Sequence, residues 1–344
     1  MTTFTNHKDF GGDFGKEMIA NLKKYDSLEI ASGYFGVSLI NQIHDDLLKI
    51  AKRGYCKILI GMIYHEGVGR EQKKVLLQLN DDLKRINSES GVYIALRQYH
   101  GKIYKFKNLT DEKIYVGSSN LSASGFYSNC EFNSLILDDE TKNNVSAFLN
   151  YLLIEDFEMS APLEKVELFE KGTKKKKGKK TSASKNDLKS CAIKPNLFPK
   201  DPILSTVSIE LRVDEQPNSS LNLYFDKGRK NLNGKYMPRP WNEVEITSIK
   251  ADREQLDYPK GEFEAYAQDG TNFYKIPMIT ASDNFKAITS KGNREVLGEL
   301  IKGKLEQLGY LERYERITSE NLTEYGKKTI ELNKFADGKY YLVF

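Results

Sequence analysis

The sequence predicts two folded domains. The first is an α/β sandwich with a mixed sheet flanked by helices, and the second is a mainly β, barrel-like domain with one or two helices. The chain has 344 residues, enough for two domains of about 150 residues each. Strand-like and helical patterns alternate over residues 1–160, whereas β-like patterns dominate after residue 190. Residues 171–190, which lie between them, contain almost no apolar side chains.

The N-terminal half begins with strands and helices in alternation. Ser27–Phe35 has the pattern of a strand, and Val37–Arg53 has apolar residues at helical spacing before Gly54. A second strand at Tyr55–Ile63 and a second helix at Gln72–Asn87 follow. The remaining elements are four short strands and one helix: Val92–Leu96, Gly101–Phe106, Lys113–Gly117, Glu131–Leu137, and a helix from Asp138 or Asp139 to about Phe157.

The segment 171–190 is expected to be a mobile tether. Residues 171–189 hold nine lysines and one acidic residue, so they carry +8, while the whole chain carries +4 and the remainder therefore −4. With so few apolar side chains, burial cannot offset the entropy of ordering this segment. The simplest interpretation is a solvated linker, and non-specific binding to phosphates is compatible with it.

The sequence pattern of the C-terminal half is typical of a β domain. Five β-like stretches come first: Thr206–Val213, Leu221–Phe225, Glu243–Ile249, Glu262–Ala267 and Phe273–Met278. One helix is predicted at Arg294–Leu308, between Asn293 as N-cap and Gly309 as its end, and a short one at Ser319–Tyr325. Two strands, Thr329–Asn333 and Lys339–Phe344, complete the chain.

Composition excludes several classes of protein. Hydrophobic residues make up 39% and charged residues 29%, a globular mixture. No apolar run approaches the roughly 18 residues that span a bilayer, and the N-terminus lacks a secretory pattern, so no membrane partner is expected. The three cysteines, Cys56, Cys130 and Cys191, form no CxxC pair. This spacing argues against a disulfide scaffold or a zinc site and favours a cytoplasmic location.

The segment from Tyr99 to Ser134 holds the residues that indicate chemistry. In a strand, His100 and Lys102 share one face because side chains alternate. Asn120 follows in the turn GSSNLSASG, and Glu131 opens the next strand. Adjacent strands can therefore bring an imidazole, an ammonium, a carboxamide and a carboxylate to one place.

This set of groups suits the hydrolysis of a phosphate diester. The imidazole can attack phosphorus, while Lys102 and Asn120 bond the non-bridging oxygens. Glu131 can accept a hydrogen bond from the other ring nitrogen and so fix the tautomer. Ser118 is expected to be a turn residue that contacts phosphate rather than a nucleophile, because no separate base accompanies it. A histidine alone on a strand is more often structural, and the other three groups decide for catalysis. Tyr34 and Phe35 are expected in the core.

The pattern HGK, GSSN and Glu131 resembles the half-motif H-x-K…G-S-x-N…E of the phospholipase D superfamily. The spacing resembles the metal-independent restriction endonucleases of the NgoFVII type, which join a phospholipase-D-like nuclease domain to a C-terminal pseudobarrel related to the plant B-three DNA-binding domain. One departure is Lys107, which stands where many members carry Asp; this weakens a lipase interpretation more than a nuclease one. The resemblance implies a nuclease and dimerisation domain at 1–170, a Lys-rich linker at 171–190 and a DNA-binding domain at 191–344.

The family mechanism uses two histidines, one that becomes phosphohistidine and one that protonates the leaving oxygen. Of this chain's four histidines, His7, His44, His65 and His100, only His100 lies in an H-x-K context. The resemblance therefore implies a homodimer in which two His100 residues face each other across a two-fold axis. Activity is expected to follow a bell-shaped pH curve and to need no metal and no cofactor.

The second half resembles the family's DNA-binding domain, with recognition arms expected at about 218–240 and 267–287. Polar and charged side chains in these arms match base edges and phosphates. The candidates for DNA contact are Asn222, Arg229, Arg239, Asp269, Asn272 and Lys286. Trp241 is expected to be a packing residue.

The sequence thus predicts a type II restriction endonuclease that hydrolyses double-stranded DNA through a phosphohistidine without metal. A flexible tether between the DNA-binding domain and the nuclease domain favours cleavage away from the recognised site, as in type IIS enzymes. A companion DNA methyltransferase is a candidate partner. Two alternatives stay open: a lipid-directed or non-specific phosphodiesterase of the same superfamily, although no apolar surface helix supports it, and a catalytically silent DNA-binding module.

Overall fold

The computed structural model describes residues 2–7, 9–153, 158–171, 187–213 and 220–344, which form two compact units. The first unit comprises the described residues up to Lys171 together with Lys227–Pro238. The second comprises the described residues 187–226 and Arg239–Phe344. Most of the predicted linker, 172–186, lies outside the described residues, as do the end of one predicted helix, 154–157, and the start of the first expected arm.

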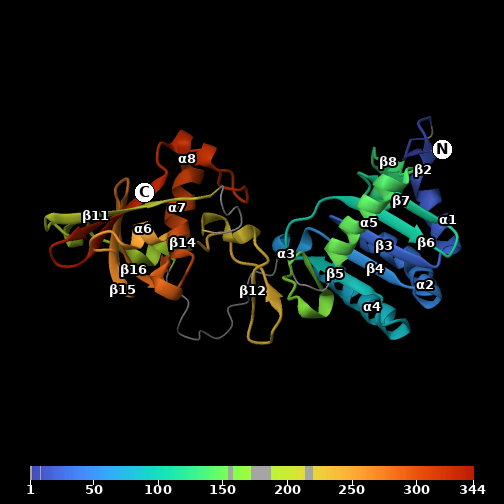
Figure 1. Ribbon diagram of the computed structural model, residues 1–344, viewed down its shortest axis with the longest axis horizontal. Helices are drawn as coiled ribbons and strands as arrows, with labels where there is room; N and C mark the ends of the chain where they lie inside the picture. The colour runs from blue at the N-terminus through green and yellow to red at the C-terminus, as the bar shows by residue number, and fades with distance from the viewer. Residues whose placement is uncertain (1, 8, 154–157, 172–186, 214–219) are drawn as a thin grey trace. The chain divides into compact units, whose positions relative to one another are not determined.

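The first unit is built on a nine-stranded mixed sheet in the order β2-β1-β8-β7-β6-β3-β4-β5-β9 (Figure 1). The strands β3, β4 and β5 are parallel, whereas β3, β6, β7 and β8 pair antiparallel. The bounds are β1 Thr3–Thr5, β2 Gly12–Asp13, β3 Ser27–Ser32, β4 Cys56–Ile60, β5 Gly91–Ala95, β6 Lys102–Lys107, β7 Glu112–Gly117, β8 Phe132–Leu135 and β9 Ser160–Pro162.

Helices cover both faces of this sheet, so the predicted α/β sandwich is confirmed. Side chains alternate along each strand. Ile30 and Ile58 therefore pack in one core with α1, α2 and α4, while Ala31 and Leu59 pack against Leu149 and its neighbours on α5. The helical bounds are α1 Phe14–Lys24, α2 Val37–Arg53, α3 Ile63–Glu66, α4 Arg70–Ile86, α5 Asp139–Leu153, the π-helical turn η1 Ser124–Ser128 and the 3-10 turn η2 Leu163–Lys165.

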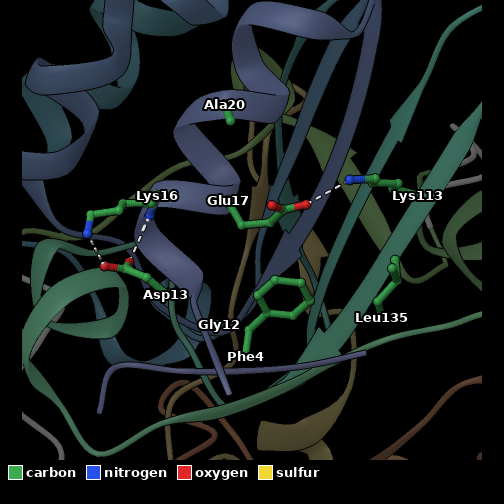
Figure 2. A pocket seen from close by; sticks show the side chains of 8 residues that line it. All are labelled: Phe4, Gly12, Asp13, Lys16, Glu17, Ala20, Lys113 and Leu135. Carbon is green, nitrogen blue, oxygen red and sulfur yellow. Dashed lines mark hydrogen bonds and ion pairs between the residues drawn. The ribbon is translucent and has the colours of Figure 1, made fainter. Parts of the chain in front are cut away.

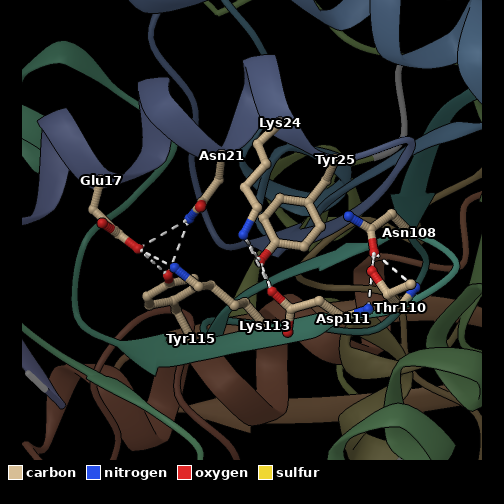
Figure 3. Close-up of polar contacts among 9 residues, drawn as sticks. All are labelled: Glu17, Asn21, Lys24, Tyr25, Asn108, Thr110, Asp111, Lys113 and Tyr115. Atoms are coloured by element: carbon tan, nitrogen blue, oxygen red, sulfur yellow. Dashed lines mark hydrogen bonds and ion pairs between the residues drawn. The ribbon is translucent and has the colours of Figure 1, made fainter.

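Helix α1 fixes β7, the strand that leads into the GSSN turn. Lys113 of β7 forms an ion pair with Glu17 of α1 at 2.8 Å, beside an open pocket that Phe4, Lys16 and Leu135 also line (Figure 2). Tyr115 of β7 donates to the same carboxylate at 2.5 Å and accepts from Asn21 at 3.0 Å (Figure 3). The charged groups of this pocket thus already pair with one another, since Lys16 also meets Asp13 at 3.3 Å.

The second unit is built on an eight-stranded sheet in the order β11-β18-β19-β15-β16-β17-β14, with β10 beside β16. The helix α7 (Val296–Gln307) buries Leu297, Leu300 and Ile301 in the core of this unit. The prediction of a mainly β domain with few helices is confirmed. The other bounds are η3 Leu188–Cys191, β10 Ala192–Ile193, η4 Pro195–Leu197, β11 Ile203–Glu210, η5 Ser220–Phe225, β14 Ile246–Thr247, α6 Lys250–Arg253, β15 Glu262–Asp269, β16 Asn272–Ala281, η6 Asp283–Phe285, β17 Ala287–Ser290, α8 Ser319–Tyr325, β18 Thr329–Phe335 and β19 Tyr340–Val343.

The strand predicted at Leu221–Phe225 is wrong, because this segment forms the 3-10 turn η5. All six residues of η5 are buried. Its backbone is kinked at Asn222, whose side-chain amide bonds both the carbonyl oxygen and the amide of Ile317, at 2.8 and 3.0 Å. A short apolar run does not by itself distinguish a buried strand from a buried helical turn.

A two-stranded hairpin, β12 (Arg229–Lys230) with β13 (Tyr236–Met237), belongs to the first unit although its flanking segments belong to the second. Tyr236 is buried in the first unit's core and bridges Val166, and the Glu167 amide donates to the Tyr236 carbonyl at 2.9 Å. The Tyr64 hydroxyl donates to the Lys227 carbonyl at 2.8 Å. Lys227–Pro238, which the sequence places in the DNA-binding domain, is thus packed in the first unit.

No helix of the described residues is long and apolar enough to cross a membrane.

Candidate active site

The two halves of the motif meet at one edge of the nine-stranded sheet. Antiparallel neighbours place the start of β6, the end of β7 and the start of β8 at the same edge. Lys102 at the start of β6 lies opposite Ser32 at the end of β3, and Gly117 at the end of β7 lies opposite Asn133. The segments that carry His100, Ser118, Asn120 and Glu131 all emerge from this edge.

His100 and Lys102 are in direct contact. The Lys102 Nζ lies 3.2 Å from His100 Nδ1, and it also donates to the carbonyl oxygen of His100. His100 is exposed, whereas Lys102 is buried. Burial lowers the pKa of Lys102, and the nearby Glu131 carboxylate partly opposes this effect. An ammonium has hydrogens to donate and no lone pair, so Nδ1 is the acceptor in this contact.

Glu131 holds the GSSN turn rather than the His100 ring. The Ser118 hydroxyl donates to Glu131 Oε2, and the Asn129 amide donates to Oε1 at 3.2 Å. The hydrogen bond to a His100 ring nitrogen that the sequence suggests is not formed between the described residues of this chain. Both carboxylate oxygens are already occupied, because Asn129 is two residues from Glu131 and the pairing of β7 with β8 brings Ser118 next to it.

Asn120 is oriented by the backbone of the neighbouring segment. Its Oδ1 accepts from the amide of Tyr34 at 3.2 Å, which leaves its two N–H groups for a ligand. The turn behind it is tight: a Cβ at Gly125 would lie 2.3 Å from the Asn120 carbonyl oxygen. Ser119 is buried, and its carbonyl accepts from the Tyr104 hydroxyl at 2.8 Å. Ser119 therefore supports the turn and does not present its hydroxyl to solvent.

Sequence reasoning missed the turn after β3, residues 32–36. Tyr34, which it placed in the core, is only half-buried and lies edge-to-face with His100 at 5.6 Å between ring centroids. A Cβ at Gly33 would lie 3.1 Å from Cδ2 of the His100 ring. The only signal in the sequence is that glycines, Gly33 and Gly36, flank an aromatic pair at the end of a strand.

The sheet edge brings together an exposed imidazole, an ammonium in contact with it and a carboxamide that Tyr34 orients. These are groups that can hold the oxygens of a phosphate while a ring nitrogen attacks phosphorus. In the part of the chain that the structure describes, no group of three or more His, Cys, Asp or Glu could hold a metal ion. The other histidines lie in local contacts, such as His44 Nε2 at 3.3 Å from Asp82 and His65 Nε2 at 3.1 Å from the Leu96 carbonyl.

Two of the six candidates for DNA contact have structural partners in the second unit. Asn222 is buried, with its amide engaged by the Ile317 backbone. Arg239 donates to the Glu243 carboxylate at 2.7 Å, and Glu243 itself is buried. Both ends of the Asn222 side-chain amide are thus bonded inside the unit, and one guanidinium nitrogen of Arg239 is paired with Glu243.

The other four candidates lie in three places. Arg229 is exposed on β12, in the hairpin of the first unit. Asp269 and Asn272 pair at the turn between β15 and β16. Lys286 is exposed in the loop at the opposite end of β16, and a ten-residue strand separates the two ends by about 30 Å. The second expected arm therefore does not bring its three candidates together.

Comparison with solved structures finds several partial matches to this chain. The polyphosphate kinase from Porphyromonas gingivalis matches with 11% identity and a TM-score of 0.34, over 44% of this chain and 22% of the kinase. NucT from Helicobacter pylori matches at 18% identity and 0.31, over 40% and 86% of the two chains. The phospholipase D family member Nuc from Salmonella typhimurium matches at 17% and 0.30, over 39% and 84%. No curated protein gives a significant match.

Two family models cover most of the chain. Residues 17–166 match the N-terminal phospholipase D domain of the NgoFVII restriction endonuclease, and residues 200–336 match its C-terminal B3-like DNA-binding domain. The first range contains every residue of the site at the sheet edge, and the second contains the whole of the sheet from β11 onward except its last strand. The chain therefore belongs to the NgoFVII restriction endonuclease family.

Proposed function

We propose that this protein is a type II restriction endonuclease that recognises a DNA sequence through its second unit and hydrolyses both strands nearby without a metal ion. The observation that carries the proposal is the convergence of His100, Lys102, Asn120 and Glu131 at one sheet edge. Cleavage displaced from the recognised sequence, as in type IIS enzymes, fits a chain in which DNA recognition and hydrolysis are assigned to two separate compact units.

The proposed reaction has two displacements at phosphorus. His100 Nε2 of one protomer attacks, the bond from phosphorus to the leaving oxygen breaks, and the partner's His100 gives that oxygen its proton. Water then attacks phosphorus, gives its proton to the partner's His100 and breaks the phosphorus–nitrogen bond. Lys102 and Asn120 hold the non-bridging oxygens, where charge accumulates in both steps.

Lys102 has to change its partner during this reaction. While Lys102 donates to Nδ1, the imidazole proton belongs on Nε2, and the Nε2 lone pair is absent. A bound phosphate attracts the ammonium away from the ring. The proton can then reside on Nδ1 and the lone pair on Nε2, which is the tautomer that attacks. Substrate binding thus prepares the nucleophile.

The dimer follows from the count of histidines. Each chain has one histidine at the site, and the two roles need two. Apolar side chains close to the site are exposed in the single chain. Phe132 adjoins Glu131 and is 57% exposed, and Phe148, whose ring is 6.4 Å from that of Tyr99, is 45% exposed. A second copy of the chain can cover these groups while it supplies the second imidazole.

The test is digestion of plasmid DNA in EDTA by the intact protein and by His100→Ala. Discrete fragments from the native protein and none from the variant, with the variant still retarding DNA in a gel, support the proposal. His44→Ala is the matched control, because it removes an imidazole from α2 and is expected to cut normally. A smear of fragments would indicate a non-specific nuclease, and cleavage that requires added magnesium would refute the metal-free mechanism.

A further inference from the structure

The turn after β3 joins the two halves of the motif. The amide of Gly33 donates to the carbonyl of Gly101, inside the H-x-K segment, at 3.2 Å. The amide of Gly36 donates to the carbonyl of Leu121, directly after Asn120, at 2.9 Å. The Ser32 hydroxyl accepts from the Leu121 amide at 3.0 Å. Residues 32–36 thus bond both segments that carry the reacting groups.

Tyr34 lies at the centre of this turn and touches both halves. Its amide donates to Oδ1 of Asn120, and its ring meets the His100 ring at an interplanar angle of 79°. Its hydroxyl donates to Glu66 Oε1 on α3 at 2.6 Å. Burial and the Glu66 carboxylate raise the pKa of Tyr34 to about 12, so the hydroxyl remains a donor throughout the neutral range.

We infer that Tyr34, anchored by Glu66, is a positioning residue that sets the orientation of the His100 imidazole and the Asn120 amide for attack on phosphorus. This inference rests on the proposed function. We assign Tyr34 a positioning rather than a catalytic role, because its hydroxyl is bound to Glu66 and its ring contacts the imidazole.

The physical reason is the exposure of His100. An exposed imidazole can adopt several side-chain orientations, and only one of them directs Nε2 at phosphorus. Tyr34 packs edge-to-face with the imidazole and so restricts its rotation, and Gly33 allows the close approach of the ring because it has no Cβ. A misplacement of about 1 Å at a reacting atom can cost a hundredfold in rate. A half-buried tyrosine with both ends fixed is a suitable restraint.

The test compares single-turnover cleavage of plasmid DNA in EDTA, with enzyme in excess. Tyr34→Ala is expected to lower the maximal rate constant roughly 10- to 100-fold. The enzyme concentration that gives half of the maximal rate is expected to stay within about twofold, because DNA binding is not the property affected. A merely structural role would lower the amount of active enzyme, and so the amplitude of the single-turnover phase, and would leave its rate constant in place.

The anchor is tested separately by Tyr34→Phe and Glu66→Ala, which remove the same hydrogen bond from its two ends. Each is expected to slow the single-turnover step by a similar factor, and the double variant is expected to be no slower than either single variant. Additive losses would refute the anchor. These variants keep the ring, so they remain informative if Tyr34→Ala does not fold.

Tyr55→Ala and Tyr55→Phe are the matched controls. Tyr55 is half-buried and its hydroxyl also donates to a carboxylate, that of Glu29 at 3.2 Å, but it precedes β4 and so lies at the far edge of the sheet. If Tyr34→Ala cleaves with the same maximal rate constant as Tyr55→Ala, the inference is overturned. His100→Ala in the same assay separates the two failures, because residual cleavage by that variant refutes the proposed function itself.

Discussion

Arg239 and Glu243 form an ion pair in which the carboxylate is buried, so we expect the arginine to stabilise the second unit. Their side chains are 18% and 2% exposed, and Arg294 lies farther from Glu243, at 3.9 Å. Removing one partner of a buried pair leaves the other charge without compensation.

We expect Arg239→Ala to destabilise the second unit by about 3 kcal/mol, because Glu243 stays buried while it loses the cation that lies 2.7 Å from its carboxylate. Trp241 is the only tryptophan of the chain, so urea unfolding followed by its fluorescence reports on this unit alone. The exposed Lys286→Ala is the control and is expected to leave the midpoint unchanged. An Arg239→Ala protein with the native midpoint but weaker sequence-specific binding would return Arg239 to the DNA-reading set.

Lys302 is a buried lysine on α7 whose ionisation affects the same unit. Its Nζ donates to the Trp241 carbonyl at 2.6 Å and lies 4.0 Å from the centre of the indole ring. Burial lowers the pKa of Lys302 to about 7, although Glu306 acts in the opposite direction. In the unfolded chain the amine titrates at its ordinary, higher pKa. Between these two values the unfolded state binds more protons than the folded state, so stability must rise with pH.

We expect the free energy of unfolding of the second unit to increase by about 2 kcal/mol from roughly pH 7 to pH 9. Lys302→Met keeps an unbranched side chain of similar length without a titrating group, and its unfolding free energy is expected to vary much less over this range. Urea titrations at several pH values, followed by Trp241 fluorescence, make the measurement. Equal pH slopes for the two proteins would show that Lys302 is protonated in the fold.

At the scale of elements, helices and strands with a regular apolar pattern can be predicted from the sequence, whereas segments placed by long-range packing cannot. The helix α2 is found at Val37–Arg53 as predicted, because its apolar stripe is unbroken and glycine lies on each side. The helix α1 was missed although the sequence carries its signals. Phe14, Met18 and Leu22 repeat every four residues, and the Asp13 side chain caps the Lys16 amide at 2.9 Å.

The hairpin of β12 and β13 belongs to a unit that its local sequence pattern does not predict. Nothing local distinguishes Lys227–Pro238 from its neighbours, yet Tyr236 is buried in the first unit through contacts with residues some 70 positions earlier, such as Val166. The site shows the same division. The strand pattern was enough to place His100, Lys102, Asn120 and Glu131 at one edge. The partners of Glu131, Ser118 and Asn129, depend on the three-dimensional positions of the donors around it, which the strand pattern does not give.

At the scale of the whole molecule, the active site is expected to be complete only in a dimer. A single chain offers one imidazole at the sheet edge, next to exposed apolar side chains such as Phe132. A shared site predicts how much activity a mixture of native and His100→Ala chains retains. A mixed dimer has only one of the two histidines that the reaction needs.

We therefore expect activity to follow the square of the native fraction when native and His100→Ala chains are unfolded together, refolded and assayed on plasmid DNA in EDTA. With equal amounts of the two chains, about one quarter of the dimers are native pairs, so about one quarter of the activity should remain. A chain with a complete site of its own would retain about one half. Light scattering on the native protein provides the control for assembly, and a monomeric mass with full activity would contradict the shared site directly.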